Sequence, residues 1–233
     1  MLIKLISWNI WFGTHLDKVS QFLKKSQADI IGLQEVTQTP EGKNNIGKQI
    51  AAELEYSYVY ATGMDLRKYG KPFVMGNAVL SKYPIISSKT HLLSKTDSRV
   101  AIQADIQIEN TQLHIFNTHL IHTHQKPSPI QEEQAKDLIS VLLKEKTIVM
   151  GDFNATPESK AIQLLSKKLR KADGNSAQPT WSVYSEGCEM CLPKGLTIRL
   201  DYIFTTNDIQ QKTFTIHDSN GSDHLPISLI IKE

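Results

Sequence analysis

Strand-like apolar runs and amphipathic helical segments alternate along the whole chain. Asp29–Leu33 carries a short, continuous apolar run, which is typical of a strand buried on both faces. Ala101–Ile108 instead alternates apolar and polar residues with the two-residue period of a strand. Because helix-bearing and hairpin-like stretches are mixed, the pattern predicts an α/β fold with mixed sheets rather than a purely parallel one.

The periodicities predict four helices and eleven strands. The helices cover Leu16–Lys25, Ile46–Leu54, Ile130–Leu143 and a segment from Pro157 to about Lys168. The strands cover Leu2–Ile10, Asp29–Leu33, Tyr56–Tyr60, Asn77–Ser81, Ile85–Leu92, Val100–Ile108, Leu113–Thr118, Thr147–Met150, Leu200–Thr205, Gln211–His217 and Ile227–Ile231. Residues 172–197 have weak periodicity and are expected to form a loop. With neither a repeat nor a linker in view, we expect one domain over residues 1–233.

Composition excludes several classes of protein. The chain has 26 Lys+Arg and 24 Asp+Glu, and the resulting charge of +2 does not by itself argue for a nucleic-acid binder. Its two cysteines, Cys188 and Cys191, are too few for a disulfide-built scaffold, and we expect reduced loop thiols or a local disulfide. No apolar run approaches the ~18 residues of a membrane span. Without a recognisable signal peptide, we expect a cytoplasmic protein, and we expect it to be a monomer.

Polar residues follow the predicted strands at the points where the strands end. These residues are Asn9, Glu35, Asn117–His119, Asp152–Asn154, Asp201 and, before the last strand, Ser222–His224. Each of them alone is commonly a turn residue or a helix cap. Because strand ends converge in α/β sheets, their joint occurrence predicts one pocket.

The residue types in this pocket narrow its chemistry. The oxygen donors Asn9, Glu35 and Asp223 suit Mg²⁺ or Mn²⁺. Histidines beside carboxylates suit proton transfer and the stabilisation of anions. The sequence contains neither a Walker-type phosphate loop nor a G-x-S-x-G elbow. Metal-assisted hydrolysis of a phosphoester is therefore the reaction class that fits best.

Seven strings taken together resemble the endonuclease/exonuclease/phosphatase superfamily, the DNase I-like phosphoesterases. The strings are Ser7–Ile10, Asp29–Glu35, Gly76–Ser81, Asn117–Leu120, Gly151–Asn154, Arg199–Phe204 and Ser222–Pro226. No single string is decisive, but their joint order is specific and spans nearly the whole chain. The resemblance implies a four-layer α/β sandwich, in which two mixed β-sheets pack face to face with helices outside.

The resemblance also implies a metal site. Glu35 matches the principal metal ligand of the family, and Asn9 and Asp223 match its neighbours in the site. The expected cofactor is Mg²⁺ or Mn²⁺.

Five further positions match catalytic residues of the family. Asp152 resembles the residue that orients or deprotonates the attacking water, and Asn154 resembles the one that holds the water or the phosphate. His224 resembles the catalytic histidine, with Asp201 as the carboxylate that orients it. His119 resembles the residue that donates to a non-bridging phosphate oxygen. Whether Asp152 or His224 is the base stays open at this point.

Weaker signals surround this core. Arg99, Asn77 and Trp181 are candidate substrate-binding residues; a solvated arginine is an equal alternative for Arg99, and covering the core is one for Trp181. A second metal on His122 and His124 is not expected, because no Cys or acid stands near them in sequence.

A basic run also follows the Asp152 strand. It consists of Lys160, Lys167, Lys168, Arg170 and Lys171. This run could track a polyanion, although a solvated helix face is the expected reading.

The substrate is the least constrained prediction. We expect a nucleic-acid phosphodiesterase, acting as an endo- or exonuclease. The alternatives are a phosphatase or phospholipase-type enzyme for inositol phosphates or sphingomyelin-like lipids, and a catalytically silent binding scaffold. The same fold serves all of these functions, so it does not choose among them.

Overall fold

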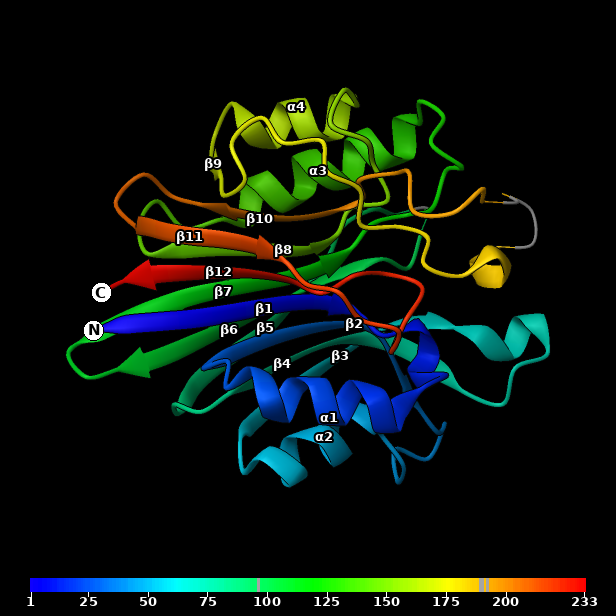
Figure 1. Cartoon of the computed structure of the whole chain (residues 1–233), viewed down its shortest axis with the longest axis horizontal. Coiled ribbons are helices and arrows are strands. Elements are labelled where there is room, and N and C mark those ends of the chain that lie inside the picture. The colour runs from blue at the N-terminus through cyan, green and yellow to red at the C-terminus, as the bar shows by residue number, and fades with distance from the viewer. Residues whose placement is uncertain (96, 189–190, 192) are drawn as a thin grey trace.

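A computed structural model describes residues 1–95, 97–188, 191 and 193–233 of the chain. Its strands form two six-stranded mixed sheets (Figure 1). In order across the first sheet, the strands are β11 (Gln210–Ile216), β12 (Ile227–Lys232), β1 (Leu2–Asn9), β2 (Ile30–Gln38), β4 (Val74–Ser81) and β3 (Ser57–Asp65). Across the second sheet they are β5 (Ile85–Leu92), β6 (Val100–Ile108), β7 (Thr111–His119), β8 (Thr147–Asp152), β10 (Asp201–Thr205) and β9 (Arg170–Lys171). One neighbouring pair in each sheet is parallel, β1 with β2 and β7 with β8.

The two sheets lie face to face between two helical layers, as Figure 1 shows. Aliphatic side chains of both sheets, such as Leu5 and Ile115, form the buried layer between them. Helices α1 (Leu16–Ser26) and α2 (Ile46–Leu54) pack on the outer face of the first sheet, and α3 (Pro129–Val141) and α4 (Lys160–Ser166) on that of the second. The predicted four-layer α/β sandwich is therefore confirmed.

Several element boundaries differ from the prediction, each for a local reason. β2 continues to Gln38 because a bulge carries the strand past its polar residues. The last helix does not begin at Pro157. Ser159 caps it by accepting a hydrogen bond from the backbone N–H of Ile162, and the helix starts at Lys160. None of the helices in the described residues is long and apolar enough to cross a membrane.

One contact joins the strand ends of the two sheets, and a close backbone approach joins two strands within the second sheet. The Asn117 amide on β7 donates to the carbonyls of Leu33 and Ala78, at 2.8 Å each, and thereby bridges the two sheets. On β8, a side chain at Gly151 would place its Cβ 2.0 Å from the carbonyl oxygen of Thr118. Only glycine fits so close a backbone approach, which explains the Gly-Asp sequence at the end of β8.

Candidate active site

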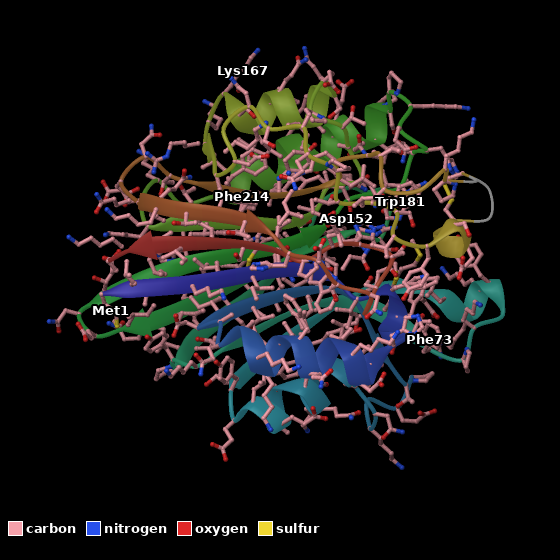
Figure 2. The ribbon with its side chains drawn as sticks, in the orientation of Figure 1. Met1, Phe73, Asp152, Lys167, Trp181 and Phe214 are labelled. Carbon is pink, nitrogen blue, oxygen red and sulfur yellow. A yellow bond between two sulfur atoms is a disulfide. The ribbon has the colours of Figure 1, made fainter. Side chains whose placement is uncertain are left out.

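A cavity of about 210 Å³ opens where β1, β2, β7 and β8 end. The side chains that line it are Trp11, Phe12, Glu35, Arg99, His119, His122, Asp152, Asn154, Trp181, Cys188, Asp223 and His224. Eight of these were predicted as site residues. In Figure 2, Asp152 and Trp181 lie toward this end of the sandwich, and Met1 lies at the other end.

A β-bulge turns Glu35 toward this cavity. Between the pairs Leu33–Ala78 and Val36–Gly76, two residues of β2 stand opposite the single residue Asn77 of β4. Glu35 takes up the extra length with a φ of 55°, in the left-handed region that a residue with a side chain rarely adopts. Such bulges re-aim a side chain out of the regular alternation.

Asp152 stands at the centre of the site. Its Oδ2 accepts a hydrogen bond from the Asn9 amide at 3.0 Å, and its Oδ1 accepts one from the backbone N–H of Asn154 at 2.8 Å. The same Oδ2 lies 3.4 Å from Nε2 of His119 and 3.6 Å from Nε2 of His224. Burial raises the pKa of the Asp152 carboxyl above its ordinary value, against the opposing attraction of His224.

His224 is held by a buried carboxylate. Its Nδ1 donates to Oδ2 of Asp201 at 2.9 Å, and the Thr180 hydroxyl donates to the same oxygen. Burial alone lowers the pKa of His224, but the carboxylates of Asp201, Asp152 and Asp223 outweigh it and hold the pKa well above its ordinary value. The surrounding acids therefore favour the charged form of the imidazole.

His119 has the opposite electrostatics although it lies beside the same carboxylate. Burial, and then the charges of Arg99 and His224, lower the pKa of His119 well below its ordinary value. Its Nε2 accepts a hydrogen bond from the Asn154 amide at 2.9 Å, and that amide also donates to the Leu120 carbonyl. Two histidines in one pocket thus have different charges, which is the usual sign of different tasks.

Arg99 brings a buried positive charge to the cavity. Its Nη1 lies 3.4 Å from the carbonyl oxygen of His119, and its Nε is 3.9 Å from the carboxylate of Asp97. That Nε has no hydrogen-bond partner in the described part of the chain. A buried guanidinium with an unused N–H is suited to an anion, because an unpaired buried donor is unfavourable.

The other two candidate substrate residues are more enclosed than a contact surface requires. Trp181 is buried, and its indole N–H donates to Oδ2 of Asp223 at 2.9 Å, so it positions a predicted metal ligand. Asn77 is absent from the lining of the main cavity. Its amide donates to the Val100 carbonyl at 2.9 Å, and the side chain faces a small adjoining cavity.

Sequence reasoning missed the aromatic pair Trp11–Phe12. The two residues belong to a 3-10 helix over Trp11–Gly13, and both have positive φ values, of 46° and 56°. Their one available signal was position, since they directly follow the polar end of β1. Sequence reasoning also treated His122 and His124 separately from the cysteines, which was wrong. The structure brings both histidines to the disulfide between Cys188 and Cys191.

The donor set of the pocket fits a hard divalent cation. Burial raises the pKa of Glu35 to about 7, and it also raises the pKa of Asp152 and of Asp223. The negative charge of a neighbouring acid, Asp223 for Glu35 and Asp201 for Asp152, raises the pKa of each of these two groups further. A bound dication would relieve the repulsion among these carboxylates, of which Asp152 and Asp223 are buried and Glu35 is partly buried, and Asn9 adds a neutral oxygen donor.

The comparisons with known proteins agree with this fold. The model of the Endonuclease/Exonuclease/phosphatase family matches residues 6–224. No curated protein matches the chain.

Many solved structures resemble this chain, and three of them illustrate the range. A family protein from Leptotrichia buccalis has a TM-score of 0.80 and 18% identity, over 99% of this chain and 100% of that one. A mannosyl-6-phosphatase from Bacteroides thetaiotaomicron has a TM-score of 0.76 and 17% identity, and the match covers 99% of this chain and 100% of that one. The human nocturnin catalytic domain with bound sulfate has a TM-score of 0.74 and 20% identity, and the match covers 99% of this chain and 94% of that one. At such low sequence identity, these matches show that the chain and the three proteins share a fold.

Proposed function

The chain belongs to the endonuclease/exonuclease/phosphatase family, and on that premise we propose that it is a metal-dependent hydrolase of phosphoester bonds. The observation that carries this proposal is the convergence of a charged histidine, a neutral histidine, a buried arginine and three raised-pKa carboxylates on one cavity. Perturbed groups of this kind concentrate where enzymes do their chemistry.

Glu35, Asn9 and Asp223 would hold the metal ion. When bound, Mg²⁺ or Mn²⁺ supplies positive charge that neutralises the phosphoryl group and the leaving oxygen. Trp181 keeps the Asp223 carboxylate in place through its indole N–H.

The pKa shifts of His224 and Asp152 suggest how the attacking water is activated. Because the neighbouring carboxylates favour the charged form of His224, we assign this residue the task of stabilising negative charge on the phosphate. Asp152 remains as the base that orients the attacking water and takes its proton. Asp201 keeps His224 charged and fixes its ring through Nδ1. Arg99 binds a non-bridging phosphate oxygen with its unused N–H.

For the substrate we retain a nucleic-acid phosphodiester as the first candidate. Its support is the half-exposed pair Trp11–Phe12 at the pocket, since aromatic rings offer stacking surfaces to unpaired bases.

The basic run gives this candidate no support. Arg170 donates to the Ile209 carbonyl, and Lys171 lies 3.9 Å from Asp173. Figure 2 shows Lys167 away from Asp152 and Trp181.

A compact phosphomonoester is the second candidate. Arg99 is the one Lys or Arg side chain among the described residues that line the cavity, and a single phosphate needs few cations. The resemblance in fold to a mannosyl-6-phosphatase makes sugar and inositol phosphates the first compounds of this class to try.

An activity panel with added Mg²⁺ or Mn²⁺ tests both candidates. It compares single-stranded and duplex DNA, abasic DNA and RNA with mannose 6-phosphate, inositol phosphates and sphingomyelin. The Glu35→Gln variant, purified in parallel, controls for contaminating phosphoesterases. Turnover of any substrate that needs the metal and disappears in Glu35→Gln supports the hydrolase. Equal turnover by wild type and Glu35→Gln on every substrate contradicts it.

A further inference from the structure

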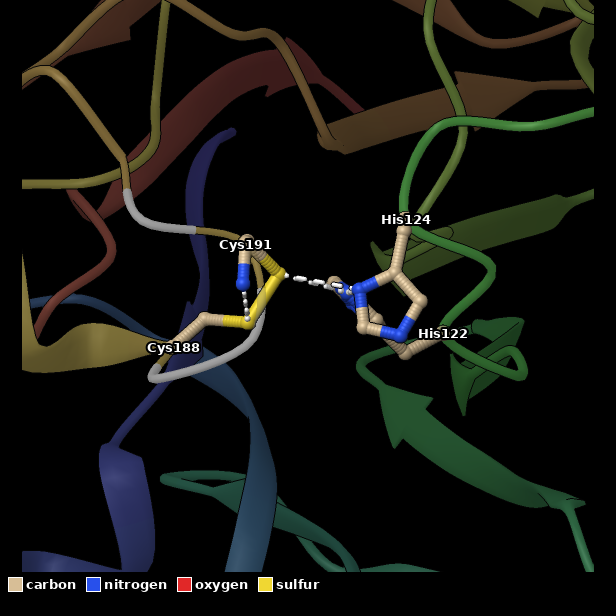
Figure 3. A group of neighbouring side chains, drawn as sticks. All are labelled: His122, His124, Cys188 and Cys191. Carbon is tan, nitrogen blue, oxygen red and sulfur yellow. Dashed lines mark hydrogen bonds between the residues drawn. A yellow bond between two sulfur atoms is a disulfide. The ribbon is translucent and has the colours of Figure 1, made fainter.

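Four soft metal-ligating side chains gather at one wall of the pocket (Figure 3). His122 and His124 lie in the segment that follows β7, and Cys188 and Cys191 lie between β9 and β10. Their ligand atoms all lie within 4.8 Å of one another. Nε2 of His122 and Nδ1 of His124 are 3.2 Å apart, and they lie 3.2 Å and 3.1 Å from Sγ of Cys191.

Hydrogen bonds already orient one of these histidines as a ligand. Nδ1 of His122 donates to the side-chain oxygen of Asn154 at 2.8 Å. This bond places the ring proton on Nδ1 and leaves the lone pair of Nε2 directed at His124 and Cys191. Histidines that bind metals are held in this way by a partner on their other nitrogen.

The cysteine turn has a matching feature. The backbone N–H of Cys191 donates to Sγ of Cys188 at 3.0 Å. A hydrogen bond to sulfur stabilises a thiolate, because it favours the charged form of the group. His124 is turned toward the cysteines from a left-handed backbone conformation, with a φ of 51°.

We propose that these four residues form a tetrahedral zinc site when the Cys188–Cys191 disulfide is reduced. Zinc–nitrogen bonds of about 2.0–2.1 Å and zinc–sulfur bonds of about 2.3 Å imply ligand separations of roughly 3.3–3.8 Å at tetrahedral geometry. The nitrogen–nitrogen and nitrogen–sulfur separations given above are already close to this range. The sulfur pair alone is too close, because the two atoms share a covalent bond.

The disulfide and the zinc site therefore exclude each other. A dithiol or phosphine reductant supplies two electrons that break the sulfur–sulfur bond, and two protons from solvent complete the thiols. Zinc then displaces both thiol protons as it binds the thiolates. The reductant leaves as its own disulfide or as a phosphine oxide, in the second case with oxygen taken from water.

This second site differs in chemistry from the predicted metal site in the same pocket. Thiolate and imidazole ligands select zinc, whereas Glu35 and Asp223 offer the hard oxygens that suit Mg²⁺ or Mn²⁺. The two sites are linked through Asn154, whose side chain contacts both His119 and His122. Cys188 and His122 also line the cavity, so the state of the cysteines sets the shape of its wall.

Cobalt binding tests the proposal with a readout that is independent of activity. The full chain, free of any histidine tag, is reduced with a phosphine under anaerobic conditions and titrated with Co²⁺. With excess Mg²⁺ present to occupy the oxygen-ligand site, we expect one thiolate-bound cobalt per chain, with a thiolate-to-cobalt charge-transfer band and the visible bands of a tetrahedral ion. Added Zn²⁺ should abolish the charge-transfer band and the visible cobalt bands. The oxidised protein should show neither kind of band when cobalt is added. Because the chain has two cysteines in all, a thiolate band can arise only from this pair.

Variants assign the ligands. The double variant Cys188→Ser/Cys191→Ser should lose the charge-transfer band, and His124→Ala should weaken binding by at least ~10-fold. The matched control is His217→Ala, which changes a histidine directly after β11 that bonds to Ser228; this variant should bind cobalt as wild type does.

Wild-type protein alone supplies the second measurement, in case a variant does not fold. Zinc should protect both thiols of the reduced chain from alkylation at stoichiometric concentration. The proposal is overturned if the reduced wild type shows no thiolate band or no protection. It is equally overturned if folded His124→Ala binds cobalt as tightly as wild type, because the cysteines would then bind without the histidines.

Discussion

The floor and the wall of the pocket are built in different ways. We call Asn9, Glu35, Asp152, Asp201 and His224 the floor, because strands or the segments beside them deliver these residues. Asp152 and Asp201 are each 1% exposed, and hydrogen bonds tie them to neighbours from distant parts of the chain.

The wall consists of Trp11, Phe12, His122 and Cys188, which come from loops and a single 3-10 turn. Its side chains are half-exposed. Rigid elements hold reacting groups more accurately than loops do, so the floor suits chemistry and the wall suits selection of the substrate. The predictions below test this division, beginning with the largest expected effect.

Glu35→Gln should have the largest effect. The substitution keeps the size of the side chain and removes the charge that a hard dication needs. We expect kcat to fall by at least ~10³-fold, as for loss of a main stabiliser of transition-state charge. EDTA should abolish wild-type activity, and Mg²⁺ or Mn²⁺ should restore it. Full activity in EDTA would contradict the assignment of the floor as a metal site.

Asp201→Asn and His224→Ala should act as one unit. We expect losses in kcat of roughly 10²-fold for Asp201→Asn and roughly 10³-fold for His224→Ala. Because Asp201 acts through His224, the double variant should be scarcely slower than His224→Ala alone. The measurement is kcat for all four proteins on one substrate. Additive losses in log kcat would instead mean that the two residues act independently.

The metal-free floor should also make stability depend on pH. The pKa of Glu35 is raised from its ordinary value of 4.5 to about 7, so ionising this group opposes folding. Its destabilising effect is absent below pH 4.5 and complete above about pH 7, which is the reverse of a salt-bridged acid.

This effect is measured by urea unfolding in EDTA at about pH 5 and about pH 8. The wild type should lose up to about 3 kcal/mol more than Glu35→Gln between these two conditions, at about 1.36 kcal/mol per pKa unit. Saturating Mg²⁺ should remove most of the difference. Equal losses in the two proteins would show that Glu35 ionises freely in the folded state.

A wall substitution should affect binding more than chemistry. If Trp11 stacks on the substrate, Trp11→Ala should raise KM by about 10-fold and leave kcat within about 3-fold, since one stacked base contributes about 1–3 kcal/mol. Steady-state kinetics on the best substrate of the panel measures both constants. A fall in kcat as large as that of His224→Ala would remove the distinction between floor and wall.

Lys167→Gln/Lys168→Gln should have the smallest effect. Both lysines directly follow α4, and Figure 2 shows Lys167 on the side of the molecule away from Asp152. We expect kcat/KM to stay within about 2-fold of wild type on every substrate, with the same dependence on salt. A flatter salt dependence for nucleic acid would indicate that a long polyanion reaches this helix.

The sequence predicted that the floor residues lie together, because its signals there are local. Apolar runs that end in Asp152, Glu35 or Asn9 follow from strand periodicity and the convergence of strand ends. The bulge at Glu35 was not predictable, because it depends on how β2 pairs with β4. The sequence also contains no sign that His122 meets Cys191. Both residues lie in segments without periodicity, and the packing of two distant loops brings them together.

The bulge at Glu35 has an evolutionary consequence. One extra residue in β2 places this carboxylate in the pocket, and a one-residue deletion there would restore regular pairing with β4. The pairs Leu33–Ala78 and Val36–Gly76 on either side of the bulge would be kept, so the following side chains would stay on their faces and the buried layer between the sheets would persist. The deletion of a single codon would thus remove the predicted metal-binding carboxylate from the pocket and leave the fold in place. Descendants could keep the cavity and bind phosphate esters without cleaving them.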